Sequence, residues 1–153
     1  MENTQNTQNT GERDTIRLLR ECDAGSKMAV SSIDEVMDKI SDPAMKKLLK
    51  ESKDHHSKLG NELHELLNRH ESEEKDPSLM AKGMSRIMTN VKISMDNCDA
   101  TIADLMTDGC NMGIKSLYRY LNQYKAADKS ARDICKRLIS IEEALCKKLT
   151  DYL

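Results

Sequence analysis

The stretch that decides the fold reads Cys22-Asp23-Ala24-Gly25-Ser26-Lys27, and a second stretch, Cys110-Asn111-Met112-Gly113-Ile114-Lys115, has the same Cys-x-x-Gly-x-Lys spacing. Each stretch is followed by the rest of a helix, by a polar break and by a second helix. The breaks are Asp42-Pro43 and Asp128-Lys129-Ser130. Two antiparallel helical hairpins are the components of a four-helix bundle. The sequence therefore predicts an all-α, antiparallel four-helix bundle.

Apolar residues recur at steps of three and four, which is the spacing of one face of a helix. We expect helices over residues 12–41, 43–70, 99–125 and 130–152. Asp42 suits the N-cap of the second helix and Pro43 its first position. The inward stripe of that helix is predicted to contain Met45, Leu48, Ser52, His55, Leu59, Leu63 and Leu66. Because the turn before it is short, the first two helices should be antiparallel neighbours.

Two segments fall outside the four-helix count. Residues 1–11 are polar and unpatterned, so we expect a disordered tail, with residues 12–153 forming a single domain. Between the hairpins, we expect residues 78–95 to form an extra amphipathic helix in the crossover, with Met80, Met84, Ile87, Met88, Val91 and Met95 on its apolar face. We expect this apolar face to be buried, either against the flank of the bundle or against a second subunit. We expect a homodimer formed through Ser78–Met95.

Composition excludes several classes of protein. Aromatic residues make up only 3% of the chain, with no Trp and no Phe, so a sheet is disfavoured. The net charge of -2 gives no basic field for nucleic acid. No apolar run approaches the roughly 20 residues that span a bilayer. The first eleven residues lack the apolar core of a secretory signal, and we expect a cytoplasmic protein with no membrane partner.

The five cysteines are odd in number and widely spaced, and none forms a C-x-x-C motif. Buried free thiols explain them better than a disulfide framework. Cys22 and Cys110 each precede a glycine, Gly25 and Gly113, by three positions. Small residues at these positions predict that the helices over 12–41 and 99–125 approach each other closely at mid-bundle.

The whole pattern resembles the ferritin-like superfamily and, more closely, a bacterial ferritin-like family of unknown function. The resemblance covers about residues 12–152. It rests on the Asp42-Pro43 break followed by Leu48-Leu49 and the His55 region, on the inserted segment from Gly83-Met84 to Val91-Lys92, and on the run from Ile102 through Leu117-Tyr118 to Leu121. The order, lengths and spacing together carry the resemblance, which implies a ferritin-like bundle.

The superfamily's metalloenzymes imply a di-metal site made by a Glu on one helix and Glu-x-x-His on the next, in each hairpin. In the second helix of this chain, His55 fills the His position, but Ser52 stands at the Glu position. In the fourth helix, Glu142 can fill the Glu position, but Leu145 stands at the His position. Most of the implied di-metal pattern is therefore missing.

The lone carboxylates of the other two helices should fall near Asp23 or Ser26 and near Asn111 or Gly113. The metal-ligand candidates are Asp23, Glu51, His55 and Glu142, because Glu51 lies one turn before His55. A histidine with carboxylates suits iron, manganese or zinc. The alternative is a core His55 hydrogen-bonded to Ser52 or Ser26, or a His55 that reaches the edge of the bundle.

Two functions are compatible with this pattern. The loss of most ligands favours a non-enzymatic ferritin-like protein with no cofactor, acting as an oligomeric structural or interaction protein. The alternative is a reduced iron, manganese or zinc site linked to iron or oxidative-stress chemistry. The sequence shows no phosphate-binding loop, H-E-x-x-H motif or other recognised catalytic motif.

Overall fold

The computed structural model describes residues 2–70 and 98–153, and every regular element in these ranges is helical. The elements are α1 (Glu2–Met37), α2 (Pro43–Arg69), α4 (Cys98–Gln123), α5 (Lys129–Leu149) and the short 3-10 helix η1 (Thr150–Tyr152). The predicted all-α class is confirmed. The predicted amphipathic helix over residues 78–95 lies outside the described residues.

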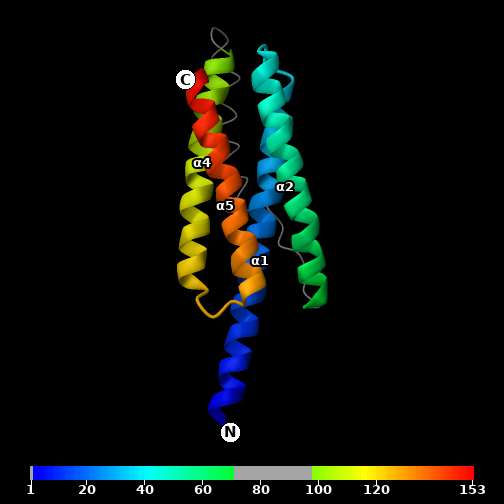
Figure 1. Ribbon diagram of the computed structural model, residues 1–153, viewed down its shortest axis with the longest axis vertical. Coiled ribbons are helices and arrows are strands. Elements are labelled where there is room, and N and C mark those ends of the chain that lie inside the picture. The colour runs from blue at the N-terminus through cyan, green and yellow to red at the C-terminus, as the bar shows by residue number, and fades with distance from the viewer. Residues whose placement is uncertain (1, 71–97) are drawn as a thin grey trace.

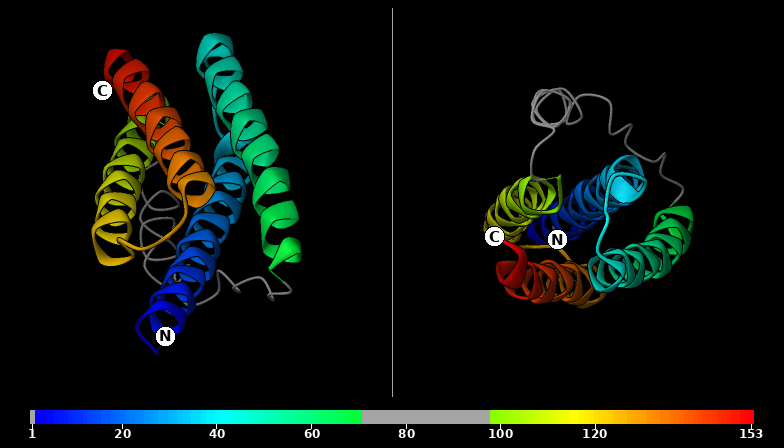
Figure 2. Two further views of the ribbon diagram at one scale, coloured as in Figure 1. Left: turned by 60° about the horizontal axis from the view of Figure 1, so that its bottom comes forward. Right: turned by 90° about the horizontal axis from the view of Figure 1, so that it is seen from above.

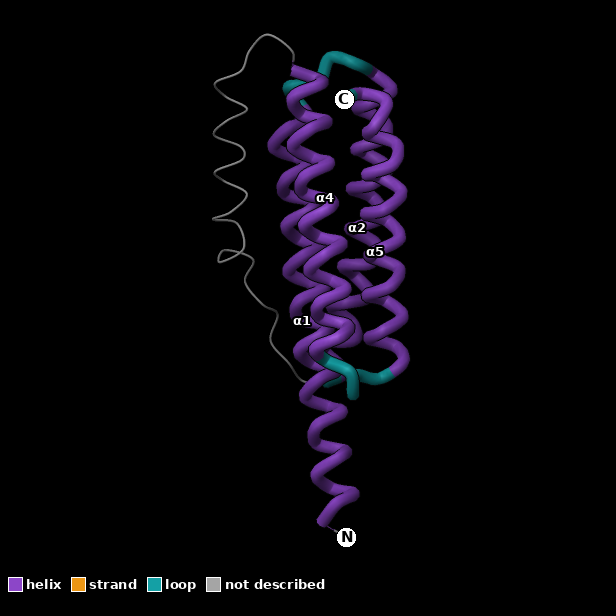
Figure 3. The backbone as a smooth tube through the Cα atoms, turned by 90° about the vertical axis from the view of Figure 1, so that its left-hand side faces the viewer, coloured by secondary structure: helices purple, strands orange, loops and turns teal. Residues whose placement is uncertain are grey.

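The four long helices lie side by side as two hairpins (Figure 1). Helix α1 rises and α2 returns antiparallel to it, whereas α4 starts at the top, runs parallel to α2, and is followed by α5 rising again. The view along the axis shows the helices arranged around one core (Figure 2). Helix α2 ends at the bottom of the bundle and α4 begins at its top (Figures 1 and 3).

Two apolar clusters fill the core, one in each half of the bundle. The first contains Leu18, Leu19, Leu59, Leu63, Leu121, Ile134 and Leu138, and the second contains Ile33, Val36, Met45, Leu49, Ile102, Leu145 and Leu149. Between the clusters lies a buried polar layer with Ser26, Ser52, His56 and Glu142. The candidate site is therefore at mid-bundle, with apolar packing on both sides.

Each hairpin turn is held by a side chain from the other hairpin. The two carboxylate oxygens of Asp99, at the start of α4, accept the backbone N–H groups of Ser41 and Asp42, each at 2.8 Å. At the other end, Thr15 of α1 accepts the N–H of Asp128 at 2.8 Å. Backbone N–H groups in the turns lack helical partners, and these bonds satisfy them. Each bond also joins the two hairpins at one end of the bundle.

The cap prediction is confirmed: Asp42 accepts the N–H of Met45 at 2.9 Å, and Pro43 is the first residue of α2. Helix α4 starts at Cys98, close to the expected residue 99. Helix α1 differs from the prediction, because it begins at Glu2 rather than near residue 12 and ends at Met37. Residues 4–10 are exposed helical turns that continue α1 below the bundle, in place of the expected disordered tail (Figure 3).

The inward stripe predicted for α2 is wrong by one residue at three positions. The helix contains the adjacent pairs Leu48-Leu49, His55-His56 and Leu66-Leu67, and the structure buries the second member of each pair. His55 is exposed and His56 is fully buried. Steps of three and steps of four fit a 3.6-residue period equally well over one turn, so the sequence pattern alone did not distinguish the two registers.

Candidate functional site

The centre of the polar layer is an ion pair between His56 of α2 and Glu142 of α5. His56 Nε2 lies 2.7 Å from Glu142 Oε1, and the side chains are 1% and 12% exposed. The other ring nitrogen, Nδ1, donates to the backbone carbonyl of Ser52 at 2.8 Å, one turn earlier on α2. Both nitrogens of His56 therefore have partners within the protein.

These partners fix the protonation of the ring. A carbonyl oxygen only accepts, so Nδ1 carries a proton. Burial lowers the pKa of His56, but the hydrogen bond and charge of Glu142, together with the Ser52 carbonyl, outweigh burial and raise that pKa above its ordinary value. The raised pKa favours the imidazolium form, in which Nε2 donates to Glu142.

A second polar contact ties α1 to this pair. Ser26 Oγ donates to the backbone carbonyl of His56 at 2.7 Å. Gly60, one turn after His56, lies next to this bond, and a Cβ at that position would make an ordinary contact with Ser26 Oγ at 3.6 Å. Helices α1, α2 and α5 are thus linked through one histidine.

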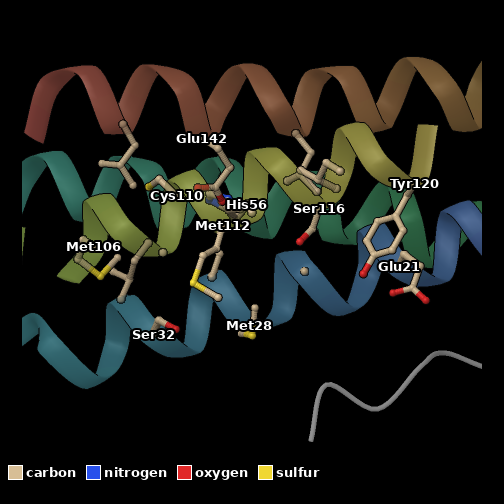
Figure 4. Close-up of a pocket in the computed structure, with 18 residues that line it drawn as sticks. Glu21, Met28, Ser32, His56, Met106, Cys110, Met112, Ser116, Tyr120 and Glu142 are labelled. Atoms are coloured by element: carbon tan, nitrogen blue, oxygen red, sulfur yellow. The ribbon is translucent and has the colours of Figure 1, made fainter. Parts of the chain in front are cut away.

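Helix α4 contributes Cys110, which lies beside Glu142 (Figure 4). Burial and then the charge of Glu142 and the hydrogen bond with it raise the pKa of the Cys110 thiol far above its usual range. The thiol is therefore protonated at neutral pH. A protonated, buried thiol is neither a nucleophile nor a metal ligand in that state.

A cavity opens from this group towards the gap between α1 and α4. Its volume is about 140 Å³, and Glu142, His56 and Cys110 form one side of it (Figure 4). Glu21 and Tyr120 stand at one end. Burial, then the charge of Glu21 and the hydrogen bond with it, raise the pKa of Tyr120, so its hydroxyl is protonated. The remainder of the lining is mostly apolar.

The four predicted metal-ligand candidates are divided among three separate hollows. Asp23 is buried beside a hollow between α1 and α2, where Lys27 Nζ pairs with it at 2.9 Å. Glu51 and His55 are exposed at a hollow between α2 and α5. Glu142 lines the central cavity. The structure therefore does not bring these four side chains together, and the inward placement of His55 is corrected to His56.

Sequence reasoning missed His56 and Cys110 as members of the central group. For His56, the signal was the adjacent pair His55-His56, with two histidines available to one helix face. For Cys110, the signal was its place in the repeated Cys-x-x-Gly stretch, whose small residues predicted only close packing. The partnership of both residues with Glu142 depends on the arrangement of three helices and has no signature in the sequence.

The residues at the centre do not fit a di-metal site. A histidine binds a metal through a neutral ring with a free nitrogen lone pair, but Nδ1 and Nε2 of His56 are both engaged in the protein. Across residues 2–70 and 98–153, no group of three or more His, Cys, Asp and Glu side chains is arranged to hold a metal ion. The buried polar side chains at the centre pair with each other instead of converging on an ion site.

Comparison with known proteins gives one assignment. A family model described as Domain of unknown function (DUF2383) matches residues 14–123, which is most of the chain. The chain belongs to this family. The part matched by DUF2383 includes His56 and Cys110 but stops before α5, which provides Glu142. Searches of curated proteins and of solved structures found no match to this DUF2383 protein. None of the helices described is long and apolar enough to cross a membrane.

Proposed function

We propose that this protein is a non-enzymatic bundle of ferritin-like ancestry that acts through its surface, as an oligomeric structural or interaction protein of the cytoplasm. The order of the helices supports the ancestry, because the first hairpin ends and the second hairpin begins at opposite ends of the bundle, as in ferritin-like folds with one long crossover. The His56–Glu142 pair supports the absence of metal chemistry, and it is the observation that carries the proposal.

A metal ion at the centre of the bundle would have to displace the existing contacts of His56. To ligate an ion, His56 would have to lose a proton and give up the 2.7 Å contact with Glu142 or the 2.8 Å bond to Ser52. The ion would itself balance the buried charge of Glu142, so the cost of binding lies in the deprotonation of His56 and in the loss of its hydrogen bonds. The pair is thus a stable substitute for the metal ligands of the superfamily.

The alternative, a reduced iron, manganese or zinc site, has weaker support. Its candidates Asp23, Glu51, His55 and Glu142 line three different hollows. Two-metal chemistry needs ligands that bridge and hold both ions. We therefore do not adopt this alternative, and a stoichiometric metal ion in the purified protein would restore it.

Elemental analysis by mass spectrometry tests the metal-free part of the proposal. Untagged protein, purified without chelator, should contain far less than one equivalent of iron, manganese or zinc per chain. A matched pair of variants adds a second readout: neither His55→Ala nor His56→Ala should change the metal content. Metal near one equivalent that disappears in either variant contradicts the proposal and identifies the histidine involved.

Light scattering tests the oligomeric part. The proposed dimer forms through residues 78–95, and its mass should be about twice that of the chain, which is 17.3 kDa. A charged substitution at Ile87 or Val91 should give a monomer or an aggregating protein, because it places a charge on the apolar face predicted from the sequence. A monomeric wild-type protein at high concentration would remove this part of the proposal.

A further inference from the structure

The cavity at the centre of the bundle has no role in the proposed function, and its walls are unlike a packed core. It holds about 140 Å³ between α1 and α4, and its apolar walls come from Met28, Ile33, Met106, Leu117, Leu138 and Leu145. Met112 also lines it and is 53% exposed, so this edge of the cavity reaches the surface. Interiors of proteins are normally filled to crystal-like density, so a space of this size is unusual.

The repeated glycines create the space. Gly25 of α1 and Gly113 of α4 both line the cavity, together with the small residues Ala29 and Ser116. A Cβ added at Gly25 would meet no atom of the described residues within 4 Å. Helices α1 and α4 do contact each other, but beside Gly25 they leave open space. The absent side chains leave room for another molecule.

The size of the space limits the occupant. Cavities of about 150 Å³ that are lined by aliphatic side chains stay dry and bind molecules the size of benzene. Methionine side chains adapt to irregular apolar shapes, and three of the residues around this cavity are Met28, Met106 and Met112. A molecule with one small ring, or an aliphatic molecule of similar volume, matches the available space.

The polar side of the cavity limits the charge and the hydrogen-bonding groups of a ligand. Glu142 Oε1 is bonded to His56, whereas Oε2 faces Gly113, where a Cβ would lie 3.9 Å from it. Oε2 is an acceptor on the cavity side. An anion would meet two acidic side chains, Glu142 and Glu21, and a cation would lose its hydration among mainly apolar walls. An uncharged molecule with one hydrogen-bond donor meets neither penalty.

We propose that the cavity bounded by Gly25, Gly113 and Glu142 binds a small, uncharged, mainly apolar molecule of about the size of benzene, oriented by one hydrogen bond donated to Glu142. Phenol is the probe that combines these properties. Benzene lacks the donor, and benzoate adds a negative charge to a ligand of similar size. The wild-type full chain should bind phenol saturably with one site, benzene more weakly, and benzoate not measurably.

Calorimetric titration of variants tests the location. Gly25→Leu places a side chain in the open space and should weaken phenol binding at least tenfold. The matched control is Gly60→Ala on α2, where the added Cβ makes an ordinary contact with Ser26. The affinity of this variant for phenol should stay within twofold of wild type. If Gly25→Leu does not fold, the smaller Gly25→Ala, which fits the space without displacing atoms of the described residues, should still weaken binding measurably.

Methyl NMR provides a readout that does not depend on substitution. Phenol should shift the methyl signals of Met28 and Met106, which line the cavity, and should leave that of Met45, buried outside the cavity lining, unchanged. The proposal is overturned if phenol fails to saturate up to its solubility limit, if Gly25→Leu binds as tightly as wild type, or if benzoate binds as well as phenol. Saturable binding that Gly25→Leu removes and Gly60→Ala keeps would establish the site.

Discussion

His56 Nε2 and Glu142 Oε1 are 2.7 Å apart although their residues are 86 positions apart in the chain. The contact joins α2 of the first hairpin to α5 of the second, between the two apolar clusters. With the bond from Ser26 to the His56 carbonyl, it gives the middle of the bundle a specific polar connection. A polar contact of this kind fixes the relative position of helices that apolar packing alone allows to slide.

Breaking the pair from one side should destabilise the fold strongly. His56→Ala or Glu142→Ala leaves a buried group without its partner, and we expect a loss of about 3–5 kcal/mol in the free energy of unfolding. The double variant His56→Leu/Glu142→Met should lose less than either single variant, because no charge is then buried. Urea denaturation measures all three variants.

The control for this series is His55→Ala, which removes the exposed neighbour of His56. Its free energy of unfolding should stay within about 0.5 kcal/mol of wild type. An equal loss in His55→Ala and His56→Ala would contradict the register described for α2.

The stability of the fold should fall as the pH rises above the ordinary pKa of histidine. Burial lowers the pKa of His56, but Glu142 and the Ser52 carbonyl raise it by more, so the folded state keeps the proton longer than the unfolded chain does. The contribution of the pair is complete below about pH 6.5, where histidine is protonated in both states. It is lost as the pH rises through the raised pKa of the folded state.

Urea denaturation at a series of pH values measures this loss of stability. The series should start at about pH 6, below the ordinary pKa of histidine. The comparison is with His56→Gln, which cannot titrate and should show a flatter dependence over the same range. A wild-type stability that rises with pH, or the same slope in both proteins, would show that His56 is not held as an imidazolium.

The cross-hairpin bonds of Asp99 should contribute measurably to stability. Asp99→Ala removes the acceptor of the Ser41 and Asp42 N–H groups and a negative charge from the first turn of α4, and we expect a loss of about 1–3 kcal/mol. Thermal unfolding measures it. Asp104→Ala, an exposed aspartate on the same helix, is the matched control and should change stability by less than about 0.5 kcal/mol. Equal effects would mean that Asp99 acts only through its charge.

The cysteines should differ widely in their reactivity towards an alkylating agent. Cys146 is partly exposed, whereas Cys22 and Cys110 are buried. A hydrogen bond with Cys135, followed by burial, raises the pKa of Cys22, and burial followed by Glu142 raises that of Cys110. Among Cys22, Cys110, Cys135 and Cys146, peptide mapping after a short treatment of the native protein should find Cys146 modified first. Early modification of Cys110 would show that the reagent reaches its thiol through the central cavity.

Local features of the structure were predictable from the sequence. Asp42 and Pro43 mark a helix start because a side-chain acceptor and a fixed φ suit that position wherever it occurs. The period of Leu, Ile and Met shows which segments are helical, because the same steric rule acts at every turn. The repeated Cys-x-x-Gly stretch showed correctly that the chain contains two hairpins.

The site was decided by tertiary structure. Adjacent residues such as His55 and His56 differ by about 100° around a helix, and only the neighbouring helices determine which of them points inwards. The partnership of His56 with Glu142 required α2 and α5 to meet, and the open space beside Gly25 depends on how α1 packs against its neighbours. The sequence by itself determined the helices and their caps, because these depend on neighbours along the chain. The rotation of each helix and the space between helices depend on the packing of all four, which only the folded structure decides.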